Sequence, residues 1–116
     1  MTAQIFHNPR CSKSRETLAL LNSHNIDADI VEYLKDSPSI ETLEAIIKQL
    51  GFDSARQLMR TKEDIYKELA LKEQHDEAAL LLAMHQHPKL IERPIVIHNN
   101  RAAIGRPPEA VLALFK

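Results

Sequence analysis

The sequence predicts an α/β domain in which a βαβ start and a ββα end share one mixed four-stranded sheet, with an all-helical insertion between them. A strand-like segment, Ala3 to Phe6, leads into a helical pattern. A β-branched segment, Pro94 to His98, lies near the other end, and residues 38–90 carry only helical patterns. No repeat, linker or shift in composition divides the 116 residues, so we expect a single domain over 1–116 with the helical insertion at about 38–90.

The first elements are a strand, a helix and a second strand. Gln4 to Phe6 is short and apolar, and Ser12 to Ser23 has helical spacing with Leu18 and Leu21 facing inward. Asp27 to Tyr33 is rich in β-favouring residues, although its alternation is imperfect. Together they predict the βαβ start.

The middle of the chain is predicted to be helical throughout. Ser39 can cap a helix that Gly51 closes, and its apolar residues follow i, i+3, i+4, i+7 spacing at Leu43, Ile46, Ile47 and Leu50. Short helical pieces are expected from Asp53 to Leu71, and a further helix, capped by Asp76, runs to His85.

The last elements predict a hairpin and a helix. Pro94 to His98 forms a strand, Asn99-Asn100 a turn, and Ala102 to Ile104 a strand that pairs back. Pro107-Pro108 then opens a final helix. This order, with a cysteine at the first helix, is the layout of a thioredoxin-like fold.

Composition excludes several classes of function. Lys and Arg (15) nearly balance Asp and Glu (16), which argues against nucleic-acid or membrane-surface binding. The longest apolar run, Ala78 to Met84, is too short to span a bilayer, and the first residues lack a signal-peptide pattern. A single cysteine forms no internal disulfide and fits a reducing, cytoplasmic setting. Two glycines cannot make a phosphate-binding loop, and the histidines lack metal-ligand spacing, so we expect no metal and no bound cofactor.

Cys11 is the best candidate for chemistry. It lies where the first strand passes into the first helix, with Arg10, Lys13 and Arg15 close by. Unpaired N–H groups and the positive end of the helix dipole favour the thiolate, which is the nucleophilic form. The alternative, an inert buried cysteine, prefers apolar neighbours.

Four segments carry a resemblance to a known family. They are His7 to Arg15, Leu58-Met59-Arg60, Gln86 to Val96, and Ile104 to Glu109. In order and separation they are similar to the glutaredoxin-coupled arsenate reductases of the thioredoxin superfamily. The resemblance implies reduction of arsenate to arsenite, with glutathione as co-substrate and glutaredoxin as partner.

The resemblance also implies roles for individual residues. Cys11 would be the nucleophile, Arg60, Arg93 and Arg106 would bind arsenate or a similar oxyanion, and Pro94 would be a cis proline facing the thiol. The planar, permanently charged arginine fork suits a tetrahedral oxyanion. Arg93 and Arg106 each precede a proline, which favours extended geometry at strand or loop ends.

Two supporting residues have open roles. Ser14 makes the motif Cys-x-x-Ser, so the chain lacks an internal resolving cysteine. Ser14 is a candidate hydrogen-bond donor to the thiolate, and equally an ordinary first-turn helix serine. His7 is a candidate to tune the thiol, and an exposed, structurally neutral histidine explains it equally well.

Two other functions remain open. One is a redox-sensing regulator of the same superfamily that binds a protein partner, which the absence of a second cysteine disfavours. The other is a glutathione-linked thiol transferase with a different substrate, because nothing in the residues distinguishes arsenate from a similar anion.

Overall fold

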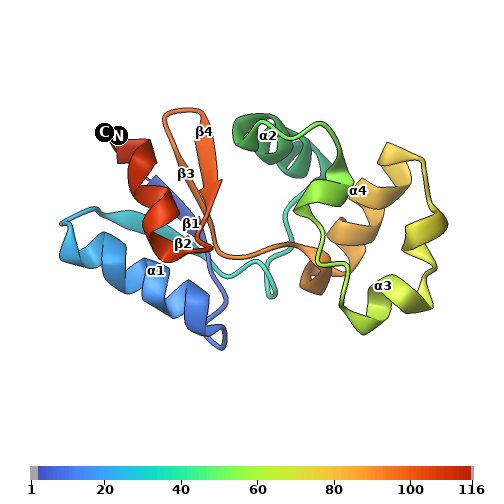
Figure 1. The fold of residues 1–116 in the computed structure, drawn as a ribbon, viewed down its shortest axis with the longest axis horizontal. Coiled ribbons are helices and arrows are strands. Elements are labelled where there is room, and N and C mark those ends of the chain that lie inside the picture. The colour runs from blue at the N-terminus through green and yellow to red at the C-terminus, as the bar shows by residue number, and fades with distance from the viewer. Residues whose placement is uncertain (1–2, 116) are drawn as a thin grey trace. The chain divides into compact units, whose positions relative to one another are not determined.

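The computed structural model describes residues 3–115 and has the predicted order of elements: βαβ, a helical middle, then ββα (Figure 1). The chain divides into two compact units. The first contains the described residues up to 36 together with those from 93 onward, and the second contains residues 37–92.

The first unit contains a four-stranded sheet in the order β2-β1-β3-β4. The strands are β1 (Ala3–Phe6), β2 (Ala28–Val31), β3 (Ile95–His98) and β4 (Arg101–Ile104). β1 runs parallel to β2 and antiparallel to β3, which forms a hairpin with β4. The predicted mixed four-stranded α/β sheet is therefore confirmed.

Two helices cover one face of this sheet, α1 (Ser12–Ser23) and the 3₁₀ helix η4 (Pro108–Phe115) (Figure 1). The register places Ile5 opposite Val96, so both side chains face the same side of the sheet. They are fully buried with Leu21 of α1 and with Val111 and Leu114 of η4. This core packs α1 and η4 against the strands β1 and β3.

Three local differences separate the prediction from the structure. The second strand ends at Val31, and Tyr33 lies beyond it as a buried loop residue. The predicted last helix has 3₁₀ geometry. Thr17, which is not predicted as a core residue, is fully buried, while the partly buried Leu18 packs against the core as predicted.

The second unit consists of short helices. They are α2 (Ile40–Leu50), η1 (Ala55–Leu58), α3 (Asp64–Glu68), η2 (Leu71–Glu73), α4 (Glu77–Gln86) and η3 (Pro88–Leu90). Ser39 caps α2 by accepting the Thr42 amide N–H, and Gly51 ends it with a φ of 75°, which glycine adopts without strain. Across residues 3–115, no helix has the length and apolar character needed to cross a membrane.

Candidate functional site

Cys11 is the N-cap residue of α1, at the end of a loop that is held by its own hydrogen bonds. The Cys11 amide donates to the Asn8 carbonyl oxygen at 3.0 Å, and the Arg10 amide donates to Asn8 Oδ1 at 3.0 Å. Arg15 Nη1 donates to the Pro9 carbonyl oxygen at 2.9 Å. The half-buried thiol is therefore presented by an ordered turn at the positive end of a 12-residue helix.

Several groups act on the pKa of Cys11. Burial is the largest single influence and raises the pKa. The Ser14 amide N–H, the Arg93 guanidinium and the Lys13 amide N–H oppose burial by stabilising the anion, and together they hold the pKa of Cys11 below its ordinary value. The Cys11 side chain forms no N-cap hydrogen bond with α1. The thiolate is therefore stabilised by the nearby donor groups and not by a helix-capping bond.

Arg93 and Arg106 are brought together with Cys11. Arg106 Nη2 lies 3.8 Å from Cys11 Sγ, and Arg106 Nε donates to the Arg93 carbonyl oxygen at 2.8 Å. Arg93 precedes β3 and Arg106 follows β4, so the hairpin sets their spacing. The result is a thiol next to two guanidinium groups, whose N–H groups can donate hydrogen bonds to the oxygens of a tetrahedral anion.

Gly105 connects this pair of arginines to α1. Its amide donates to the Pro94 carbonyl oxygen at 2.9 Å. A Cβ at residue 105 would lie 2.4 Å from Thr17 Oγ1 and 2.8 Å from Pro94 Cγ. Only glycine allows the segment to approach the buried Thr17 this closely. The Arg93–Pro94 bond is cis, as the resemblance implies, and so is Arg106–Pro107, which was not expected.

His7 and Ser14 form a buried pair behind the thiol. Ser14 Oγ lies 2.7 Å from His7 Nδ1 and accepts the Asn8 amide at 3.0 Å. The Ser14 hydroxyl is thus hydrogen-bonded to His7 and Asn8. The group of Ser14 that stabilises the Cys11 thiolate is its backbone amide. The reading of His7 as an exposed residue is wrong, since its side chain is buried. Burial, aided by Arg15 and opposed by Glu32, lowers the pKa of His7.

Arg60 lies in the second unit, where carboxylates hold its side chain. Its Nε lies 3.3 Å from Glu63 Oε2, and its Nη1 lies 3.1 Å from Glu92 Oε1. Its amide donates to the Leu90 carbonyl oxygen at 2.7 Å, beside a bridge between Met59 and Ile91. The substrate-binding role of Arg60 therefore stays a prediction of the resemblance.

Comparison with known proteins identifies the family of this chain. The model of the ArsC family matches residues 6–114. The chain belongs to the ArsC family. It is 54% identical to the uncharacterized protein YfgD of Escherichia coli, over 98% of each chain. It is 51% identical to the arsenate reductase of Neisseria meningitidis serogroup A, over 97% of each chain. The structure of arsenate reductase from Vibrio cholerae aligns with a TM-score of 0.95 at 53% identity, covering 98% of both chains.

The sequence predicts that unpaired N–H groups at the start of the helix favour the thiolate, and in this ArsC-family site these are the Lys13 and Ser14 amides, two and three residues after the N-cap cysteine. The sequence pattern does not predict the role of Gly105, although it is one of only two glycines and directly precedes Arg106. Among the described residues, no group of three or more His, Cys, Asp or Glu side chains is arranged to hold a metal ion.

The thiol of this ArsC-family chain should titrate at a lower pH than a free cysteine, whose pKa is about 8.5. Because Arg93 is among the groups that lower the pKa of Cys11, Arg93→Ala should move the titration upward. The rate of iodoacetamide alkylation, measured from pH 4 to pH 10, reports the thiolate fraction directly. A wild-type midpoint at the free value would contradict an activated nucleophile.

Replacing Gly105 with alanine should destabilise the first unit by about 1–3 kcal/mol, the usual cost of overpacking. The reason is the contact of the new Cβ with Thr17 and Pro94. The free energy of unfolding in urea measures this cost. A double-mutant cycle with Thr17→Ala is the control, because removing Oγ1 and Cγ2 should make the Gly105→Ala cost smaller. Equal costs in both backgrounds would mean that the contact with Thr17 does not matter.

Proposed function

We propose that this protein reduces arsenate to arsenite through a covalent intermediate on Cys11. The observation that carries the proposal is the sulfur at the N-cap of α1 with Arg106 Nη2 at 3.8 Å and with Arg93 favouring the thiolate. A thiolate near fixed positive groups can attack an electrophilic centre whose oxygens those groups hold. The names of the Neisseria meningitidis and Vibrio cholerae relatives support arsenate as the substrate.

The proposed reaction has three steps. Cys11 attacks the arsenic of arsenate, and one oxygen leaves as water, which gives a sulfur–arsenic bond. The thiol of glutathione then forms a disulfide with the Cys11 sulfur as that bond breaks, so that two electrons pass to arsenic and arsenite leaves. A thiol of glutaredoxin attacks the sulfur of the bound glutathione and releases Cys11 as thiolate.

The need for outside thiols follows from the sequence. Ser14 stands three residues after Cys11, where dithiol proteins carry a second cysteine. Each turnover therefore leaves an oxidised Cys11 that only another molecule can reduce. The same chemistry belongs in a reducing compartment, and we place it in the cytoplasm. Arg60 would supply a third guanidinium after exchanging a carboxylate partner for the substrate.

A coupled assay tests this function. The protein, arsenate, glutathione and glutaredoxin are mixed with glutathione reductase, and NADPH oxidation is followed. Turnover should stop when any one component is omitted. If Cys11 becomes glutathionylated from glutathione disulfide but arsenate is never reduced, arsenate reductase is the wrong function and the thiol-transferase alternative takes its place.

A further inference from the structure

A groove with charged walls lies between α1 and the start of η4, within the first unit. Its volume is about 470 Å³. The residues that form it come from one face of α1 and from the turn into η4: Lys13, Glu16, Leu20, Pro107, Pro108 and Glu109. The two helices run beside each other over the same face of the sheet (Figure 1).

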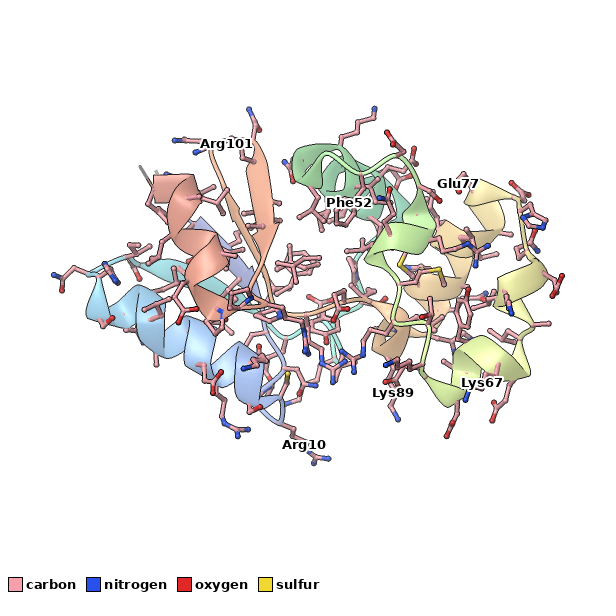
Figure 2. The ribbon with its side chains drawn as sticks, viewed as in Figure 1. Arg10, Phe52, Lys67, Glu77, Lys89 and Arg101 are labelled. Atoms are coloured by element: carbon pink, nitrogen blue, oxygen red, sulfur yellow. The ribbon has the colours of Figure 1, made fainter. Side chains whose placement is uncertain are left out.

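Two residues that line the groove, Lys13 and Pro107, are close in sequence to Cys11 and Arg106. The Lys13 amide N–H is one of the groups that stabilise the Cys11 thiolate. Pro107 directly follows Arg106, whose Nη2 lies 3.8 Å from Cys11 Sγ. By contrast, Arg10 on the other side of Cys11 points away from the fold (Figure 2). A ligand at this end of the groove would therefore lie close to residues that act on the sulfur.

The charges in the groove have both signs. Lys13 Nζ lies 3.4 Å from Glu16 Oε2, with both side chains about half exposed, at 45% and 54%. Such surface pairs contribute little free energy, so Lys13 can exchange Glu16 for a ligand carboxylate at small cost. Glu109 forms no ion pair with any of the residues 3–115. Two carboxylates against one ammonium disfavour an oxyanion, while the prolines and Leu20 offer an apolar floor.

We propose that this groove binds the γ-glutamyl end of glutathione. That end carries an ammonium and a carboxylate on the same carbon, which matches Glu109 and Lys13. Its short aliphatic chain would lie on Pro107 and Pro108, and its cysteine would face Cys11. The inference rests on the proposed function, because it assigns a place to the co-substrate of the same reaction.

Exchange with disulfides tests the groove without arsenate. The Cys11 thiolate attacks glutathione disulfide, which gives a Cys11–glutathione disulfide and one glutathione thiolate. The rate is compared with that for hydroxyethyl disulfide, which carries no charge, by mass spectrometry at a fixed pH. The ratio of the two rates cancels changes in the pKa of Cys11. The wild type should prefer glutathione disulfide, and the disulfide of γ-glutamylcysteine should keep that preference.

Glu109→Gln and Lys13→Met should each lower the preference about threefold to tenfold, between the effect of an exposed ion pair and that of a charge-assisted hydrogen bond. Glu41→Gln, an exposed carboxylate on α2, is the matched control and should keep the wild-type ratio. Equal ratios in the wild type and Glu109→Gln would overturn the inference. An effect of Glu109→Gln confined to the glutaredoxin step would also overturn it, since the groove would then bind a basic side chain of the partner protein.

The two proposals can fail separately. If the Glu109-dependent preference is found but arsenate is not reduced, the groove assignment is supported and the proposed function is wrong. If arsenate is reduced and the KM for glutathione is the same in Glu109→Gln, the function is supported and the groove assignment is wrong.

Discussion

Replacing Cys11 with serine should reduce arsenate turnover to the rate of a mixture without protein. The hydroxyl of serine is a far weaker nucleophile than a thiolate, and the chain has no other cysteine to replace it. The coupled assay measures this loss. Ser23→Ala, at the far end of α1, is the control and should keep the wild-type rate, because the Ser23 hydroxyl donates to the Leu20 carbonyl oxygen within the same helix.

The same residue predicts a strict need for external thiol. Without glutathione no arsenite should be released, because the thiol of glutathione is what breaks the sulfur–arsenic bond. After a single turnover with glutathione, mass spectrometry should find one glutathione on Cys11. Repeated turnover without any added thiol would rule out the mechanism, and so would a wild-type rate in Cys11→Ser.

Loss of either arginine near the sulfur should have the next largest effect. Arg106→Ala and Arg93→Ala should each lower kcat/KM for arsenate by roughly tenfold to a hundredfold, because a charge-assisted hydrogen bond contributes about 1.5–3 kcal/mol. Arg106 is exposed and lies outside the core, so its removal should change the melting temperature little.

Two further variants separate geometry from net charge. Arg106→Lys keeps the charge and loses the planar fork, so it should recover only part of the activity. Arg10→Ala removes a positive charge next to Cys11 whose side chain points away from the fold (Figure 2), and it should change kcat/KM less than threefold. Full activity in Arg106→Lys would contradict recognition by a guanidinium fork, and unfolding of both alanine variants would assign the arginines a structural role.

Local signals in the sequence predict most of the fold. Ser39 and Gly51 mark the ends of α2, and Asp76 caps α4 by accepting the Ala78 amide. Asn99 and Asn100 both adopt positive φ in the turn between β3 and β4, as the two-residue hairpin requires. These features depend on neighbours within a few residues, so a single sequence contains the information.

The contacts of the site depend on residues far apart in the chain, and the sequence alone predicts them less well. The bond from Arg106 Nε to the Arg93 carbonyl oxygen follows from the register of the hairpin, which the two prolines only suggest. The burial of His7 depends on packing around the first strand, and its bond to Ser14 depends on how the loop folds back. No periodic pattern in the sequence indicates that Glu63 and Glu92 form ion pairs with Arg60.

The pairing of β1 with β3 has a consequence for synthesis on the ribosome. β1 is made before the helical middle of the chain, whereas Ile95 to His98 are made after it. A domain folds as a unit, so β1 and the Cys11 loop cannot form their final contacts before the hairpin of β3 and β4 has left the ribosome. Arg93 and Arg106 flank that same hairpin. Activation of the thiol is thereby delayed until this hairpin has been made, and a fragment that ends before residue 93 would carry the cysteine without the arginines that make it reactive.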